Sequence, residues 1–158
     1  MQVFLPPTSI HNLNKKYTIF LAGSIDMGTA THWQNSIIEK LHTFDITILN
    51  PRREQWDSSI AHISEHPEFK AQVEWELTGL ENADLIVMYF DKDSKSPISL
   101  FELGLFAKSQ KIIVYCPLGF WRKGNVDIVC ERYGIPHFDN EDQFFTAIQN
   151  RLTKETAL

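Results

Sequence analysis

Glu102, in the segment Ser99-Leu-Phe-Glu-Leu-Gly104, is the side chain of this sequence whose setting most favours chemistry. The segment follows an apolar run that ends in an acid, residues 84–91, and it opens a helical pattern. We therefore expect Glu102 in the first turn of a helix, just outside the carboxyl end of a buried strand, where open α/β sheets bind ligands. A carboxylate there can attack an electrophilic carbon or hold a sugar. The spacing Ser99-x-x-Glu102 also fits a capping box, in which Glu102 only ties down its own helix start.

A second carboxylate, Glu76, comes eight residues before Asp84, near the end of a predicted long helix. Two carboxylates beside one crevice can divide the work, one as nucleophile and the other as proton donor or ligand orienter. A solvated helix residue is the other interpretation of Glu76. Asp91, an acid at the end of the apolar run, has the same two interpretations.

The segment Gly23-Ser24-Ile25-Asp26-Met27-Gly28 follows a predicted strand. Glycine lets a backbone approach a ligand closely, and the amides ahead of the next helix can bind an anion. The spacing is not that of the dinucleotide fingerprint, and the Lys-Ser/Thr pair of a P-loop is missing. The segment fits a ligand-binding loop or a tight turn.

Alternating strands and helices must position these loops. Apolar runs predict strands near residues 17–21, 46–49, 84–90, 111–115 and 135–137, with helices between them and after the last. Such alternation indicates a parallel sheet covered on both faces. We predict an α/β, flavodoxin/Rossmann-like three-layer sandwich with a five-stranded parallel sheet in the order 2-1-3-4-5. The crevice then lies between loops 23–28 and 90–99. Residues 1–16 are expected to form an N-terminal arm, and 17–158 a single domain.

Composition and net charge argue against several classes of function. The chain has 158 residues and a net charge of −5, which argues against a broad surface for a nucleic-acid polymer. Local basic patches remain at Arg52-Arg53 and Arg122-Lys123. No apolar run approaches the roughly 20 residues that span a membrane. Two cysteines without metal-type spacing predict reduced thiols in a cytoplasmic protein, and scattered histidines predict no metal or other cofactor.

Two tryptophans, Trp56 and Trp121, fall in predicted long loops. An apolar ring in a loop needs a surface to pack on. A nucleobase is one candidate for that partner, and a neighbouring subunit is another.

Several segments, in this order and spacing, resemble the nucleoside 2-deoxyribosyltransferase-like family over roughly residues 17–150. The resemblance implies a flavodoxin-type fold, cleavage of an N-glycosidic bond, and Glu102 as the nucleophile. The segments are Phe20-Leu-Ala-Gly-Ser-Ile25, Trp33-Gln34, Asn50-Pro-Arg52, Gln72-Val-Glu-Trp-Glu-Leu77, Leu80-x-x-Ala-Asp84, Pro97-Ile-Ser-Leu-Phe-Glu-Leu-Gly104 and Gly119-Phe-Trp-Arg-Lys-Gly-Asn-Val126.

The resemblance also implies roles for three other positions. The acid that contacts the base falls on Glu76, where well-studied transferases carry Asp. Ser96 stands where those enzymes place another acid, six positions before the nucleophile. The Asn that reaches the sugar 5′-hydroxyl, often from a neighbouring subunit, falls on Asn125, which implies a homodimer or higher homo-oligomer.

These observations predict a retaining double displacement on a nucleoside or nucleotide. Glu102, ionised at its helix N-terminus, attacks the anomeric carbon, and Glu76 or a nearby acid handles the proton of the base. Substrate contacts are expected from Gly23, Ser24, Ile25, Asp26, Asp91, Ser99, Asn125 and Arg52. The predicted activity is transfer of 2-deoxyribosyl between nucleobases. The alternatives are hydrolysis of a nucleoside 5′-monophosphate or of an N-glycoside of nicotinamide, and a non-catalytic nucleotide-sensing or partner-binding module.

Overall fold

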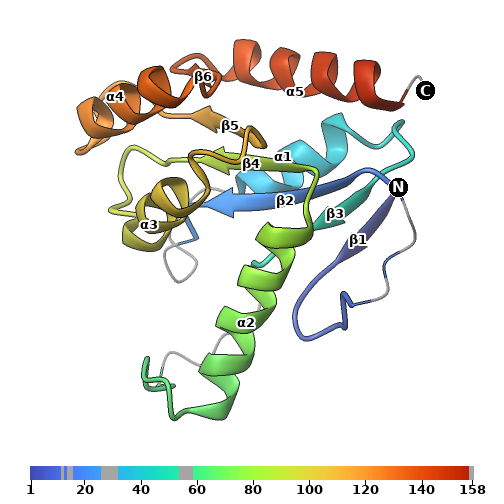
Figure 1. The fold of residues 1–158 in the computed structure, drawn as a ribbon, viewed down its shortest axis with the longest axis vertical. Coiled ribbons are helices and arrows are strands. Elements are labelled where there is room, and N and C mark those ends of the chain that lie inside the picture. The colour runs from blue at the N-terminus through green and yellow to red at the C-terminus, as the bar shows by residue number, and fades with distance from the viewer. Residues whose placement is uncertain (12, 14–15, 26–31, 54–58, 157–158) are drawn as a thin grey trace.

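A six-stranded, fully parallel sheet forms the centre of the computed structural model (Figure 1), which describes residues 1–11, 13, 16–25, 32–53 and 59–156. The strands lie in the order β1-β3-β2-β4-β5-β6. Their bounds are Gln2–Phe4 for β1, Thr18–Gly23 for β2, Thr47–Leu49 for β3, Leu85–Tyr89 for β4, Ile112–Tyr115 for β5 and His137–Phe138 for β6.

The predicted three-layer α/β class is confirmed, but the predicted number of five strands is wrong. The additional strand, β1, comes from within the predicted N-terminal arm and pairs in parallel with β3. The Gln2 N–H donates to the carbonyl of Ile46, and the Asn50 N–H donates to the carbonyl of Phe4. A strand of three residues shows no periodicity in the sequence, because it is made by filling the open edge of β3. The other five strands have the predicted order.

The described ranges contain five helices, which cover the two faces of the sheet. Trp33 and Ile37 of α1 (Trp33–Lys40) pack in one core cluster with Phe144 of α5 (Glu141–Thr156). The opposite cluster contains Trp75 of α2, Leu103 of α3 and Val126 of α4, and these helices are Pro67–Asn82, Pro97–Phe106 and Lys123–Tyr133. Each central strand is therefore buried on both sides, which is why its sequence is continuously apolar rather than alternating.

Gly23 fixes how β2 leaves the sheet beside β4. Its φ is +142°, and a Cβ at this position would lie 2.2 Å from the carbonyl oxygen of Tyr89. Only glycine fits so close to a neighbouring backbone. The next residue continues the contact, since the Ser24 N–H donates to the same carbonyl at 2.9 Å. The loop after β2 is thus held against the end of β4 at the predicted crevice.

The start of α3 differs from the prediction. Pro97 is the first helical residue, and Ser96 precedes it as N-cap in a left-handed conformation with φ of 44°. Glu102 is therefore the sixth residue of α3, in its second turn, and the first turn contains no acid. The capping-box interpretation of Ser99 and Glu102 is also wrong, because Ser99 already lies inside the helix. A proline fits the first position of a helix, where its missing N–H costs nothing.

Candidate active site

Two carboxylates, buried Glu102 of α3 and half-buried Glu76 of α2, form the candidate site. Glu102 is only 7% exposed, and burial raises its pKa to about 8, with a further contribution from the negative charge of Glu76. Burial also raises the pKa of Glu76, against the lowering effects of a hydrogen bond from Gln72 and the positive charge of Arg53. Titratable groups perturbed by burial and by a specific charged neighbour are typical of functional sites.

The charge state of Glu102 differs from the prediction. We expected a helix N-terminus to keep this carboxyl ionised, and the raised pKa has the opposite sign. The helix dipole acts mainly over the first turn, and Glu102 lies beyond it. Among the described residues, none donates a hydrogen bond that would hold the charged form of Glu102. At neutral pH this environment therefore favours the protonated form of Glu102.

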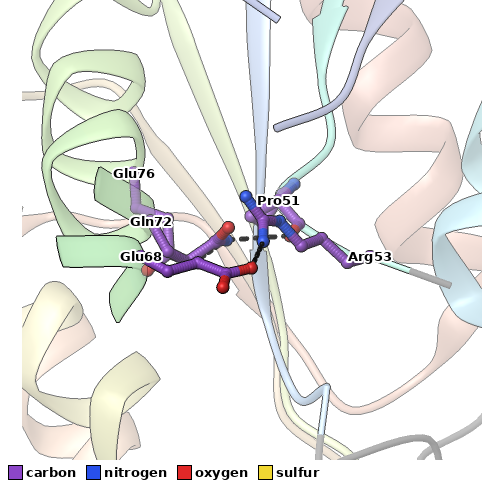
Figure 2. A network of polar contacts seen from close by, with 5 residues as sticks. All are labelled: Pro51, Arg53, Glu68, Gln72 and Glu76. Atoms are coloured by element: carbon purple, nitrogen blue, oxygen red, sulfur yellow. Dashed lines mark hydrogen bonds and ion pairs between the residues drawn. The ribbon is translucent and has the colours of Figure 1, made fainter. Parts of the chain in front are cut away.

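A polar clamp sets the position of Glu76 (Figure 2). The Gln72 Nε2 donates to Glu76 Oε1 at 2.7 Å and to the carbonyl of Pro51 at 3.1 Å. Nearby, Arg53 Nη1 lies 3.2 Å from Glu68 Oε1. Residues from one face of α2 are thereby fastened to the segment that follows β3. This clamp holds Glu76 at the carboxyl edge of the sheet.

Gln72 is a site residue that sequence reasoning did not single out. Its Oε1 is buried and accepts no hydrogen bond from the described residues. A buried acceptor without a donor is costly, so it is the kind of group that a bound ligand can satisfy. The available signal was its spacing, since Gln72 precedes Glu76 by one helical turn on α2.

A chain of serine hydroxyls joins the two loops at the crevice. The Oγ of Ser24 accepts a hydrogen bond from the Asp91 N–H at 2.8 Å and lies 2.5 Å from the Oγ of Ser96. The Oγ of Ser94 follows at 2.6 Å from that of Ser96. All three serines are buried, so their hydroxyls are used to connect the loop after β2 with the loop before α3.

The other predicted contact residues are distributed more widely. Arg52 is buried and donates from Nη1 to Gln34 Oε1 at 3.2 Å, and burial lowers its pKa. Ile25 and Asp91 are half-buried beside the serine chain. Asn125 is exposed in the first turn of α4. Asp26 and Trp56 lie outside the described residues.

The basic patches contain cations that already have partners. Arg53 pairs with Glu68, and Lys123 Nζ lies 2.9 Å from Asp127 Oδ1. The Arg122 guanidinium lies over the ring of Trp121, 4.3 Å from its centroid. A phosphate bound here would have to compete with these contacts.

Trp121 connects the loop after β5 to the segment that leads into α3. Its Nε1 donates to the carbonyl of Lys95 at 3.0 Å, and 51% of the residue surface stays exposed. Half of the indole is therefore available to a ligand or to a neighbouring subunit, the two partners considered from the sequence.

The part of the chain that the structure describes contains no group of three or more His, Cys, Asp or Glu side chains arranged to hold a metal ion. Its two cysteines, Cys116 and Cys130, are buried free thiols. None of the described helices is both long and apolar enough to cross a membrane.

Comparison with known proteins finds a family and a similar solved structure. A family model described as "Nucleoside 2-deoxyribosyltransferase like" matches residues 16–120, a stretch that includes Glu76 and Glu102. A crystal structure of a conserved protein from Enterococcus faecalis V583 is similar, with a TM-score of 0.62 and 13% identity, over 87% of this chain and 99% of that chain. At this identity the likeness shows the fold alone. A search of curated proteins finds no match.

Proposed function

Because the chain belongs to the nucleoside 2-deoxyribosyltransferase-like family, we propose that it cleaves the N-glycosidic bond of a nucleoside and transfers the 2-deoxyribosyl group to a second nucleobase. The observation that carries the proposal is the pairing of buried Glu102 with half-buried Glu76: burial, with a further contribution from the negative charge of Glu76, raises the pKa of Glu102 to about 8. Retaining cleavage of a glycosidic bond needs two carboxyl groups in different protonation states. A pair in which Glu102 keeps its proton up to a pH of about 8 provides the one proton that this requirement needs.

The proposed reaction proceeds in two displacements. An oxygen of ionised Glu102 attacks the anomeric carbon, the bond from that carbon to the base nitrogen breaks, and the electron pair leaves with the base. The base takes a proton from the carboxyl of Glu76. The incoming base then attacks the anomeric carbon of the sugar ester, Glu102 leaves as carboxylate, and the proton of the incoming base returns to Glu76.

In the proposed reaction, substrate binding must move the proton of Glu102 to Glu76. Positive charge develops on the sugar ring as the bond to the base breaks, and this charge favours an ionised Glu102 beside it. Among the described residues, Gln72 donates to Oε1 of Glu76, which leaves Oε2 to carry the proton. The clamp on α2 thus supports Glu76 as the proton donor.

The contacts of the basic residues favour a nucleoside over a nucleoside 5′-monophosphate. Arg53, Lys123 and Arg122 face Glu68, Asp127 and the Trp121 ring respectively, and Arg52 hydrogen-bonds to Gln34. Recruiting them to a phosphate would break these contacts. The half-exposed Trp121 also offers an apolar cover that would keep water from the sugar–enzyme ester, as transfer requires.

The test compares donors and acceptors. The protein is incubated with deoxynucleosides, with their 5′-monophosphates and with a nicotinamide dinucleotide, each with and without adenine, and the bases and nucleosides are separated by chromatography. We expect adenine to increase turnover of a deoxynucleoside and to yield deoxyadenosine. If base release does not depend on the acceptor and is faster with monophosphates, the protein is a hydrolase rather than a transferase. Binding of these compounds without any base release would indicate a sensing module.

A further inference from the structure

Gln72 of α2 is a buried amide that uses its donors and leaves its acceptor without a partner. Its Nε2 donates to Glu76 Oε1 at 2.7 Å and to the carbonyl of Pro51 at 3.1 Å (Figure 2). Its Oε1 is buried and accepts no hydrogen bond from the part of the chain that the structure describes. Only 9% of the residue is exposed. The remaining capacity of Gln72 is therefore one acceptor next to the carboxyl of Glu76.

The hydrogen bond to Pro51 fixes which end of the Gln72 amide is left over. The carbonyl of Pro51 can only accept a hydrogen bond, so it requires the Nε2 end of the amide. Turning the amide over would place Oε1 against that carbonyl, and two acceptors would then face each other. The unpaired atom is thus an acceptor, and a group that satisfies it must carry an N–H or an O–H.

The unpaired acceptor of Gln72 has a cost that holding Glu76 in place does not require. A buried polar atom without a partner loses its hydrogen bonds to water and gains none in return. Native proteins contain few such atoms, and a ligand that donates to Oε1 would offset the cost on binding. Solvent does not reach Oε1, so the donor has to come from a group that packs directly against the Gln72 amide.

Purine bases differ in the group that they would present to such an acceptor. Adenine carries the acceptor N7 next to the amino group N6, which donates, whereas 6-oxopurines carry N7 next to the acceptor O6. When the bond from the sugar to N9 breaks, the five-membered ring shares the electron pair between N9 and N7, so N7 can take the proton that Glu76 delivers. The group at C6 then lies on the same edge of the base as N7, as Gln72 lies beside Glu76.

We propose that Gln72 selects a 6-aminopurine as the base, because its Oε1 accepts a hydrogen bond from the exocyclic amino group while Glu76 faces N7. The inference rests on the proposed function for the presence of a base beside Glu76. In a 6-oxopurine, two acceptors, O6 and the Gln72 Oε1, would face each other. With unsubstituted purine, Oε1 would stay unpaired. The expected order of affinity is adenine, then purine, then hypoxanthine.

The first measurement uses the wild-type chain, so it does not depend on the folding of a variant. Isothermal titration calorimetry gives the dissociation constants of adenine, purine and hypoxanthine, which differ mainly in the group at C6. We expect adenine to bind at least about 10-fold more tightly than hypoxanthine, because the buried acceptor is paired in one complex and opposed in the other. The dissociation constant of purine should lie between these two values.

Two substitutions separate the acceptor of Gln72 from its hold on Glu76. Gln72→Glu keeps an acceptor oxygen but loses the Nε2 donors, whereas Gln72→Met has a similar length and loses both. The preference for adenine over hypoxanthine should persist in Gln72→Glu and fall to about 2-fold or less in Gln72→Met. A residue that only holds Glu76 in place would give the same change in both variants, because both lose the hydrogen bonds to Glu76 and Pro51.

Glu74→Met is the matched control, because Glu74 is exposed on the same helix, and it should keep the wild-type preference. Circular dichroism checks that each variant folds. If Gln72→Met does not fold, the wild-type chain still provides a test. Binding of purine as tight as that of adenine would then overturn the inference.

The outcomes distinguish base selection by Gln72 from the proposed reaction. A preference for adenine in binding that Gln72→Met loses and Gln72→Glu keeps supports the inference, whether or not a deoxynucleoside is cleaved. An absence of base release in the chromatographic assay would then count against the transfer reaction alone. Equal binding of adenine and hypoxanthine, no binding of adenine, or a preference that a folded Gln72→Met variant retains would overturn the inference, even if the protein releases bases.

Discussion

The negative charge of Glu76 on α2 raises the pKa of Glu102 on α3, so two helices that are separated by β4 in the chain set the protonation of one site. Burial is the larger cause for Glu102, and the neighbouring charge adds to it. Two carboxyl groups held together out of water destabilise the fold unless one of them keeps a proton.

Removing the Glu102 carboxylate should abolish catalysis without unfolding the protein. In Glu102→Gln we expect the rate of base release to fall by about 1,000-fold or more, because the covalent step has lost its nucleophile. Chromatographic assay of deoxynucleoside cleavage measures this loss. Circular dichroism and thermal unfolding show whether the fold persists. Turnover close to that of the wild type in a folded variant would rule out Glu102 as the nucleophile.

Stability should depend on pH through the same carboxyl. The folded-state pKa of about 8 exceeds the ordinary value of about 4.3 for a glutamate in an unfolded chain. The folded state therefore binds the proton more tightly, so this contribution to stability is complete below about pH 4.3 and is lost as the pH rises through about 8.

Replacing Glu102 by Gln should remove that loss, so the unfolding temperature of Glu102→Gln should fall less than that of the wild type between about pH 5 and about pH 9. Scanning calorimetry at several pH values measures the difference. Glu74→Gln, at an exposed position of α2, is the control and should follow the wild type. Parallel pH profiles for Glu102→Gln and the wild type would show that Glu102 is not held in a proton-binding environment.

Glu76→Gln should lower the pKa of Glu102, because it removes the negative charge that disfavours ionisation. The pKa should stay above the ordinary glutamate value, since burial remains the larger cause. Carbon-detected NMR titration of the glutamate side chains follows Glu102 directly. An unchanged or higher pKa of Glu102 in this variant would mean that the two carboxyls do not interact.

Gly23→Ala should destabilise the protein by about 3 kcal/mol or more, since the new Cβ would collide with the Tyr89 carbonyl at the end of β4. Gly119→Ala separates the effect of this collision from the backbone strain of a positive φ. Gly119 also has a positive φ, of +92°, but a Cβ there would have no atom within 4 Å. We expect a smaller loss for it, about 1–2 kcal/mol, from backbone strain alone. Urea unfolding compares the variants, and equal losses would refute the close approach of the strand ends.

Asn125 should act from a neighbouring subunit. Glu102→Ala and Asn125→Ala should each be inactive, and mixing the two under conditions that exchange subunits should restore part of the activity. This rescue requires a site that combines Glu102 of one chain with Asn125 of another. Full activity of a strictly monomeric wild-type protein, measured by light scattering and by assay, would contradict the prediction.

Much of the fold follows from local patterns. The apolar residues of β2, β4 and β5 form continuous runs because both faces of these strands are buried, and Pro67 marks the start of α2. Such patterns depend on neighbours within a few residues. The alternation of strand and helix then allows few topologies, so the order of five strands could be predicted.

Two features of the fold could not be predicted from local sequence patterns. β1 depends on hydrogen bonds to β3, which lies more than forty residues further along the chain, and three residues carry too little pattern to reveal it. The register of α3 depends on the left-handed Ser96, which the buried serine chain holds beside Ser24. Both features are determined by partners distant in sequence.

The sequence by itself determined that Glu102 follows β4 at the carboxyl edge of a parallel sheet, because strand and helix periods are local properties. Only the tertiary structure decided the charge state of Glu102 and the role of Gln72 in the clamp on Glu76. Desolvation and electrostatic repulsion act through space and depend on every segment that packs around a group. No spacing along the chain could therefore show that Glu102, expected to be ionised at a helix N-terminus, is buried next to a second carboxylate.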